Sequence, residues 1–464
     1  MLRFSCALFL AGCLLGCQPP PGDATGIEPS SATLTWGPCL SRSDGSSISP
    51  ALRCTTIEVP LDHQHPDAAK ISLRVGRHRS PVSTSAPAVF YLAGGPGQSS
   101  VEMSGALFRS DLRALSPFDL VFVDQRGTGG SGCALPCPDD PAHYLTVDAA
   151  HDLEWVRKLL GYDRIYLLGD SYGTRLGLEL MRQHGDAVVA AVLDGMLPPD
   201  VDAVTASIRL LDRGVEQLVA DCQASPRCQQ ITTDLLADLR RYRQKVRDNP
   251  RLRDPIYPAY AFEDERVYLL ELATMLRHDY LREQVPRSIH EATLGHYAAW
   301  DSLCSIVWAE VTADPLYGSP FALAPGLHEL LFCTEQLPNV DWTQASEAAA
   351  GEWARPRDVS DWQLWTATCS AWGVPALDPS LRAPVRSDTP VLLLSGAADL
   401  NVDPAWAAHA ALSLGRATQL LLPNFTHCTA PYNDCVNDLV VSFLSAGATG
   451  MDTSCLSELV PPAW

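Results

Sequence analysis

Short runs of β-branched and aromatic residues alternate with helix-like patterns in the first part of the chain. A buried strand reads as a short continuous apolar run, whereas an amphipathic helix repeats its apolar residues every three or four positions. Strands that alternate with helices favour βαβ units, so we expect a mainly parallel sheet with helices on both faces. The predicted strands are residues 71–75, 88–92, 120–123, 165–168 and 189–193.

The pattern changes after residue 199 and becomes almost entirely helical for the next stretch of chain. Within it, residues 207–222 place Ile208, Leu211 and Val215 on one helical face. Two strand-like runs then follow, at residues 391–394 and 419–422. The simplest interpretation is a sheet domain that is interrupted by a helical cap and then completed.

The N-terminus has the features of an export signal. A minimal basic start is followed by a short apolar run at residues 4–16, too short to span a bilayer. Residues 14–17 (Leu-Leu-Gly-Cys) resemble a lipobox, which predicts that Cys17 is lipidated and that the protein is exported and membrane-anchored. A plain secretory signal is one alternative, and a lipobox at residues 10–13 is another.

These patterns together divide the chain into five predicted segments. Residues 18–34 are rich in Pro, Gly, Ser and Thr, a composition that does not bury enough apolar area to order itself, so they are expected to be a flexible tether. The predicted segments are a lipoprotein signal peptide at 1–17, the tether at 18–34, the first part of the α/β domain at 35–199, the helical cap at 200–385 and the second part of the α/β domain at 386–464.

Charge and length narrow the class of protein. The chain has 464 residues, of which 46% are hydrophobic, and this is ample for a large core. Its formal net charge of −20 argues against a nucleic-acid partner, because phosphate binding needs clustered Lys and Arg. We therefore expect contact with a membrane only through the N-terminal lipid.

Cysteine usage agrees with export, because disulfides persist outside the cytoplasm. There are 15 cysteines, and twelve follow Cys17, an even number that suits full pairing. Short separations close cheaply, which favours four local pairs. These are Cys39–Cys54, Cys133–Cys137, Cys222–Cys228 and Cys435–Cys455; Cys304, Cys333, Cys369 and Cys428 are left unassigned.

A Gly-Asp-Ser-Tyr-Gly motif occupies residues 169–173, directly after a predicted strand and before a helical stretch at 174–183. G-x-S-x-G needs this strand–turn–helix setting, because the glycines permit the strained turn that exposes the serine hydroxyl. The motif predicts Ser171 as a nucleophile.

A serine at such a turn needs an acid and a histidine later in the chain. Asp399 follows the strand at 391–394 and His427 follows the strand at 419–422, so the three residues fall in the order Ser, Asp, His. The imidazole would take the serine proton while the carboxylate fixes the tautomer of the imidazole. Asp403 is the alternative acid, although its place before Pro404 favours a turn or a helix cap.

A glycine-rich loop, Ala-Gly-Gly-Pro-Gly at residues 93–97, also follows a predicted strand. In folds with a G-x-S-x-G turn, the oxyanion hole takes one main-chain N–H from such a loop and one from the residue after the nucleophile. We therefore predict that the main-chain N–H groups of Gly95 and Tyr172 form the oxyanion hole. An ordinary Gly-Pro turn is the alternative.

In combination, four motifs resemble the prolyl and tripeptidyl aminopeptidase family of α/β-hydrolases: residues 93–97, Val-Asp-Gln-Arg-Gly-Thr-Gly-Gly-Ser at 123–131, residues 169–174, and Leu-Asp-Gly at 193–195. Segments near both ends of the chain resemble, within this family, the branch of secreted tripeptidyl aminopeptidases. It implies an α/β-hydrolase fold with an inserted cap, and it implies that residues 124–127 form a buried polar turn supporting the site. Two departures are Ala93, where many relatives have His, and an acid loop one residue longer than usual.

Family members use acidic cap residues to bind a substrate ammonium group, and Glu335 resembles a recurring cap motif. The alternative is that Glu335 is one of many solvated carboxylates in an acidic protein. Residues 263–265 are likewise expected to be a solvated run of charges. Several cap tryptophans would line a substrate pocket or, more commonly, form cap core. They are Trp300, Trp308, Trp342, Trp353, Trp362 and Trp365.

The predicted function is therefore an exported serine peptidase that releases tripeptides or single residues from free peptide N-termini through an acyl-enzyme. A carboxylesterase with the same triad is the alternative, since a fold alone does not fix a function. A non-catalytic binding lipoprotein is a third possibility. No metal or organic cofactor is expected, because the triad generates its own nucleophile.

Overall fold

The computed structural model describes most of the chain after the predicted tether. The described residues are 34–108, 115–132, 141–252, 262–312, 323–324, 326–354, 366–367, 369–370, 377–428, 433–459 and 464. The predicted signal peptide, its Cys17 and nearly all of the tether lie outside these residues.

A nine-stranded sheet in the order β1-β2-β3-β5-β4-β6-β7-β10-β11 forms the centre of the molecule. The pairs from β5 through β11 are parallel, and the pairs from β1 to β5 along the other edge are antiparallel. The strands are β1 (Gly37–Pro38), β2 (Arg53–Pro60), β3 (Lys70–His78), β4 (Ala88–Leu92), β5 (Asp119–Val123), β6 (Ile165–Asp170), β7 (Val188–Asp194), β10 (Val391–Gly396) and β11 (Ala417–Leu422). All seven strands predicted from apolar runs are confirmed.

Helices pack on both faces of this sheet, as the crossover connections of a parallel sheet require, and its central strands are therefore buried on both sides. Alternate residues of a strand face opposite sides, so in β4 Phe90 packs on one face and Tyr91 on the other. One face carries α2 (Thr146–Leu159), α3 (Tyr172–His184) and α14 (Ala405–Ala411); the other carries α1 (Ser100–Leu107) and α15 (Asp434–Ala446). The predicted fold class is confirmed.

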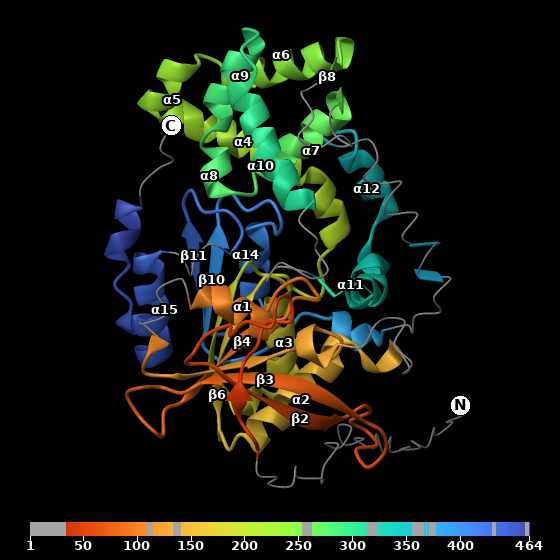
Figure 1. Cartoon of the computed structure of the whole chain (residues 1–464), viewed down its shortest axis with the longest axis vertical. Helices are drawn as coiled ribbons and strands as arrows, with labels where there is room; N and C mark the ends of the chain where they lie inside the picture. The colour runs from red at the N-terminus through yellow and green to blue at the C-terminus, as the bar shows by residue number, and fades with distance from the viewer. Residues whose placement is uncertain are drawn as a thin grey trace, which may run out of the picture.

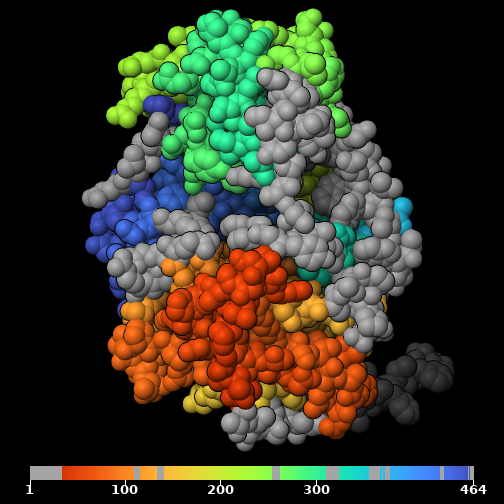
Figure 2. Space-filling view, viewed as in Figure 1, coloured from red at the N-terminus to blue at the C-terminus, as the bar shows by residue number. Residues whose placement is uncertain are grey.

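A mainly helical cap lies between β7 and β10 in the chain and above the ends of β10 and β11 (Figure 1). Figure 2 shows its green helices at one end of the molecule and the N-terminal strands at the other. Its helices are α4 (Ala203–Ala224), α5 (Pro226–Ile231), α6 (Leu235–Asp248), α7 (Glu265–Met275), α8 (Asp279–Arg282), α9 (Val285–Thr293), α10 (Ala298–Thr312), α11 (Leu327–Leu331) and α12 (Trp342–Ala348), with a π-helix at Phe332–Gln336 and a small hairpin of β8 (Arg251–Leu252) and β9 (Phe262–Glu263).

The cap has its own apolar core, which decides the role of its tryptophans. Trp300, Trp308 and Trp353 are buried within that core, so core packing is confirmed for these three. Trp342 packs at smaller clusters nearby, and Trp362 and Trp365 lie outside the described residues. No helix in the described part of the chain combines the length and the apolar character that crossing a bilayer would require.

Four disulfides are present among the described residues: Cys39–Cys54, Cys222–Cys228, Cys333–Cys369 and Cys435–Cys455. Three of them were predicted, and the predicted Cys133–Cys137 pair lies outside the described residues. The expectation that all twelve cysteines pair is wrong, because Cys428 is a free thiol. Among the described residues, Cys428 is surrounded by polar groups of the candidate site and has no second cysteine within disulfide distance.

Candidate active site

Ser171 lies in the tight turn between β6 and α3. Its backbone has φ 56° and ψ −121°, a left-handed conformation that a non-glycine residue rarely adopts. Its main-chain N–H donates to the Asp194 carbonyl oxygen at 2.8 Å, which ties the turn to the end of β7. A side chain at Gly173 would overlap the Leu92 carbonyl oxygen, so only glycine allows the turn to pack this closely against β4.

Asp399 and His427 form a hydrogen-bonded pair. Asp399 follows β10, is 1% exposed, and has its Oδ2 atom 2.7 Å from His427 Nδ1. The other carboxylate oxygen accepts from the main-chain N–H groups of Asn401 and Val402, at 2.7 and 2.9 Å. These bonds fix the carboxylate, and a proton on Nδ1 leaves Nε2 of His427 unprotonated and able to act as a base.

Asp403, the alternative acid, has a different partner. Its Oδ1 atom accepts from the main-chain N–H of Ala405 at 2.9 Å, at the start of α14. This is a turn contact from residue 405 back to residue 403, so the turn that its position before Pro404 favours is confirmed, while Pro404 is the N-cap of α14.

The imidazole of His427 and the turn at Ser171 meet at Asp194 and Gly195. A β-carbon added to Gly195 would lie 3.0 Å from His427 Cε1, while the preceding residue binds the Ser171 N–H. Among the described residues, the Ser171 hydroxyl has no hydrogen bond to the imidazole, and Nε2 instead lies 3.5 Å from Cys428 Sγ. Catalytic hydrogen bonds are often long without substrate and shorten when it binds.

Charge around His427 favours its protonated form. Burial alone would lower the pKa of His427, but the Asp399 carboxylate, followed by Asp194 and Asp170, raises it above its usual value. Burial also raises the pKa of Asp170, to about 6. The site is therefore suited to stabilise an imidazolium during a reaction.

The glycine-rich loop after β4 lies against the nucleophile. A β-carbon added to Gly94 would come 3.1 Å from Ser171 Cβ, and Gly95 adopts φ +113°, which favours glycine. The main-chain N–H groups of Gly95 and Tyr172 donate to no other described group. Both predicted donors are thus near Ser171 and available to an oxyanion, and their role stays a prediction.

Residues of the cap contact this glycine-rich loop directly. The Ala324 N–H donates to the Gly97 carbonyl oxygen, and His328 Nδ1 lies 2.9 Å from the Pro96 carbonyl oxygen. Leu323 also lies beside Gly95, 3.2 Å from where a β-carbon would be. The segment leading into α11 therefore helps to fix the loop's conformation.

Glu335 is 2% exposed, so the alternative that it is a solvated surface carboxylate is wrong. Its oxygens accept from Thr146 N, Thr146 Oγ1 and Arg175 Nε, at 2.9, 2.8 and 2.8 Å. Thr146 Oγ1 lies in turn 2.8 Å from the Tyr172 hydroxyl. This buried network joins the π-helix of the cap to α3, and sequence patterns indicated neither Thr146 nor Arg175 as its members.

Two further cap residues contact the acid and base loops. The Arg213 guanidinium of α4 donates to the Asp399 carbonyl oxygen. Asp279 Oδ1, at the start of α8, accepts from the main-chain N–H of Thr426 at 3.0 Å, next to His427. Neither residue stood out in the sequence, because a single polar residue in a helical pattern carries no sign of its distant partner.

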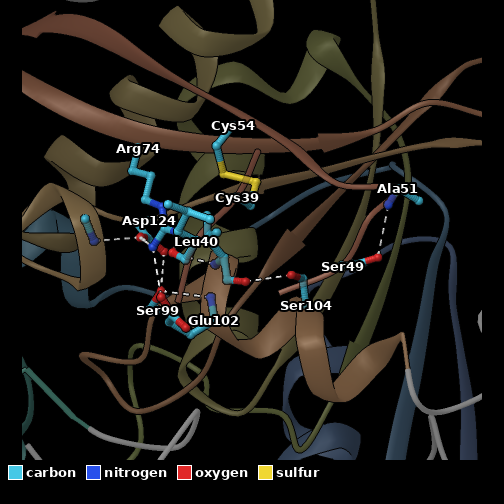
Figure 3. Close-up of a disulfide and its surroundings, with 12 residues drawn as sticks. Cys39, Leu40, Ser49, Ala51, Cys54, Arg74, Ser99, Glu102, Ser104 and Asp124 are labelled. Atoms are coloured by element: carbon cyan, nitrogen blue, oxygen red, sulfur yellow. Dashed lines mark hydrogen bonds and ion pairs between the residues drawn. A yellow bond between two sulfur atoms is a disulfide. The ribbon is translucent and has the colours of Figure 1, made fainter. Parts of the chain in front are cut away.

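The turn at residues 124–127 is buried and polar, as the family resemblance implies. Figure 3 shows Asp124 with Ser99 and Arg74 beside the Cys39–Cys54 disulfide. Its carboxylate accepts from Ser99 Oγ at 2.6 Å and from the Val101 N–H at 2.9 Å. These bonds anchor the start of α1 just after the glycine-rich loop.

Two families of known proteins match parts of this chain. Residues 87–280 match the alpha/beta hydrolase fold family, and residues 358–455 match the family described as TAP-like protein. The second match covers the segment that supplies Asp399 and His427. The chain is an α/β-hydrolase of the TAP-like family.

Curated relatives of this TAP-like hydrolase carry different names. It is 27% identical to serine protease Hip1 of Mycobacterium tuberculosis over 300 residues, which are 54% of this chain and 57% of the relative. It is 29% identical to carboxylesterase B of the same species over 276 residues, 49% of this chain and 52% of the relative. It is 30% identical to proline iminopeptidase of Aeromonas sobria over 215 residues, 42% and 49% of the two chains. The TAP-like hydrolase thus spans about half the length of the curated relatives it matches.

Solved structures that resemble the TAP-like hydrolase include a proline iminopeptidase-related protein of Thermus thermophilus, with a TM-score of 0.43 and 19% identity over 85% of this chain and 99% of that one. Proline iminopeptidase of Mycobacterium smegmatis has a TM-score of 0.42 and 16% identity over 86% and 100%.

Proposed function

We propose that this chain is an exported serine peptidase that releases short N-terminal fragments from peptides through an acyl-enzyme. The observation that carries the proposal is the hydrogen-bonded pair of Asp399 and His427, 2.7 Å apart, next to the strained Ser171 in a chain that matches the TAP-like family. The names of two relatives, a serine protease and a proline iminopeptidase, support action on peptides. Disulfides support export, because they persist in oxidising compartments.

In the proposed reaction, Ser171 Oγ attacks the scissile carbonyl carbon as His427 Nε2 takes its proton. The carbonyl oxygen becomes an oxyanion and accepts the N–H groups of Gly95 and Tyr172. Asp399 stabilises the imidazolium, which then protonates the leaving amine and frees the C-terminal part of the peptide. Water repeats the sequence on the ester and releases the short fragment.

Recognition of the substrate ammonium by Glu335 remains a prediction. Its carboxylate already accepts three hydrogen bonds from Thr146 and Arg175, so a substrate amine would have to share it. If the amine is bound there, acetylating the N-terminus of the substrate abolishes cleavage. Unchanged cleavage would remove Glu335 from that role.

Fluorogenic tripeptidyl and prolyl amides, each with a free or acetylated N-terminus, test the function directly. Cleavage of the free amides supports the peptidase, and their lengths give the size of the fragment. Ser171→Ala is expected to lower turnover about a million-fold, because triad members act as a unit. Ser305→Ala, a serine in cap helix α10, is the matched control and should keep its activity.

A carboxylesterase is the second candidate, favoured by the relative that carries this name. It would use the same triad and oxyanion hole. Simple p-nitrophenyl esters in the same panel separate the two. Rapid ester turnover without cleavage of any amide would establish the esterase.

A further inference from the structure

The thiol of Cys428 is a feature of the site that hydrolysis does not use. Cys428 directly follows His427, belongs to no disulfide, and has its Sγ atom 3.5 Å from His427 Nε2. The side chains of Ser171, His427 and Cys428 are all partly exposed, so solvent reaches this position. The thiol and the proposed base therefore face the same small space beside the nucleophile.

Two buried carboxylates face the same thiol. Asp170 and Asp194 end the neighbouring strands β6 and β7 and are 8% and 2% exposed. One oxygen of each lies within 4.8 Å of Cys428 Sγ and of the other oxygen. Parallel strands bring their carboxyl ends to one edge of a sheet, which explains why residues 24 positions apart meet here.

Asp170 also has an unsatisfied oxygen. Its Oδ2 atom accepts from the Tyr91 hydroxyl at 2.8 Å, but its buried Oδ1 atom has no hydrogen-bond partner. Burying an unpaired carboxylate oxygen is costly, because the water it has lost is not replaced. A cation next to the carboxylate would remove that cost.

The three ligands of this cluster suit zinc. Zn²⁺ binds thiolate sulfur and carboxylate oxygen, and with three protein ligands its fourth position is filled by water. The cluster of Cys428, Asp170 and Asp194 supplies one sulfur and two oxygen ligands.

We propose that Cys428 and the carboxylates of Asp170 and Asp194, beside the imidazole of His427, form an inhibitory site for Zn²⁺. The regulatory part of this proposal rests on the peptidase function proposed above. On binding, the thiol loses its proton to solvent, and Zn–S and Zn–O bonds form with no change of oxidation state. The cation neutralises two carboxylates that favour the imidazolium and lies beside His427, whose Nε2 atom is 3.5 Å from Cys428 Sγ. The base is then less able to take the Ser171 proton, so acylation is inhibited.

The ligand set also sets the selectivity of the site. A thiolate ligand favours zinc and cadmium, whereas Mg²⁺ and Ca²⁺ prefer sites made entirely of oxygen ligands. Millimolar Mg²⁺ or Ca²⁺ should therefore leave the protein unaffected where micromolar Zn²⁺ inhibits it.

Co²⁺ is the probe for binding, because a cobalt–thiolate bond gives a charge-transfer absorption band. Titrating the Ser171→Ala protein keeps the test independent of catalysis. One equivalent of Co²⁺ should give the band, and Zn²⁺ should displace it. Cys428→Ser should abolish the band and weaken Zn²⁺ binding at least about 100-fold, since even loss of groups behind a ligand costs 10–100-fold.

Two more variants show whether a loss of metal binding comes from the loss of a ligand or from a general effect on folding. Asp170→Asn keeps the shape of the side chain and should weaken Zn²⁺ binding at least about tenfold. Cys304→Ser, which changes a cysteine buried in the cap core, is the matched control and should keep the band. No band with Co²⁺, or a band that persists in Cys428→Ser, would overturn the site.

Inhibition is then measured on the protein with Ser171 intact, and each variant is compared with its own rate in a metal chelator. Zn²⁺ should inhibit the unaltered protein reversibly and Cys428→Ser only at about 100-fold higher concentration. Equal inhibition of both, or cobalt binding without inhibition by zinc, would overturn the regulatory role. A protein that binds Co²⁺ through Cys428 but cleaves no peptide would instead contradict the peptidase function and leave the metal site standing.

Discussion

The nucleophile and the acid–base pair are held by different kinds of contact. Ser171 lies within one continuous strand–turn–helix, and the cap meets that helix through the buried ion pair of Glu335 with Arg175. Asp399 and His427 lie on loops after two other strands. The cap meets those loops through hydrogen bonds that involve Arg213 and Asp279, and through Leu400, which is buried in the apolar core of the cap. The cap is therefore joined to the nucleophile side by buried charge, and to the acid–base side by apolar packing and single hydrogen bonds.

The largest effect is expected within the acid–base pair itself. Asp399→Asn keeps the shape of the side chain but favours the wrong imidazole tautomer, which should lower kcat about 10⁴-fold. The rate is measured with a tripeptidyl amide. Asp403→Asn, in the turn before α14, should stay within about tenfold of the unaltered enzyme because the Asn side-chain oxygen can still accept the hydrogen bond from the Ala405 N–H. If Asp403→Asn has the greater effect, the acid has been assigned wrongly.

The buried ion pair on the nucleophile side is tested by Glu335→Gln. Removing one charge leaves Arg175 buried without its partner, which should lower the free energy of unfolding by about 3–5 kcal/mol. The ion pair of Glu352 with Arg240 is the matched control, since its side chains are 40% and 53% exposed. Glu352→Gln should cost less than about 1 kcal/mol. Equal losses in a thermal or urea unfolding experiment would show that the buried pair does not fasten the cap.

The pH dependence tests the charge around the acid–base pair. His427 must be neutral to take a proton, and nearby carboxylates raise its pKa above 6.5 in spite of burial. The rate kcat/KM should therefore fall about tenfold for each pH unit below that raised pKa. Asp399→Asn should move the inflection to lower pH, because it removes the main group that raises the pKa. An inflection below pH 6.5 in the unaltered enzyme would contradict the arrangement of charges.

How much the sequence could predict differs between the same two regions. The strand before Ser171, the turn and the helix are contiguous, so local apolar runs and glycine positions were enough to predict them. The pairing of Glu335 with Arg175 joins residues 160 positions apart, and no periodicity records such a contact.

Buried charge in the cap was missed for the same reason. Glu263 was expected to be part of a solvated run, but it is fully buried and paired with Arg251 and the Trp300 indole. Likewise, the number of cysteines suggested that Cys428 pairs, although its place directly after His427 was the available sign of another role. A polar residue next to a predicted catalytic residue is the signal that could have been used.

The single hydrogen bond from Thr426 to Asp279 on the acid–base side gives the smallest expected effect. Asp279→Ala leaves the buried Thr426 N–H without its acceptor, which costs about 1–2 kcal/mol and loosens the loop that carries His427. Because the loop positions a base and not the substrate, kcat should fall about tenfold while KM changes less. Asp279→Asn retains an oxygen acceptor and should restore most of the rate. If Asp279→Ala destabilises the protein but leaves kcat within about twofold, then the cap does not position His427, and its contact with this loop only stabilises the fold.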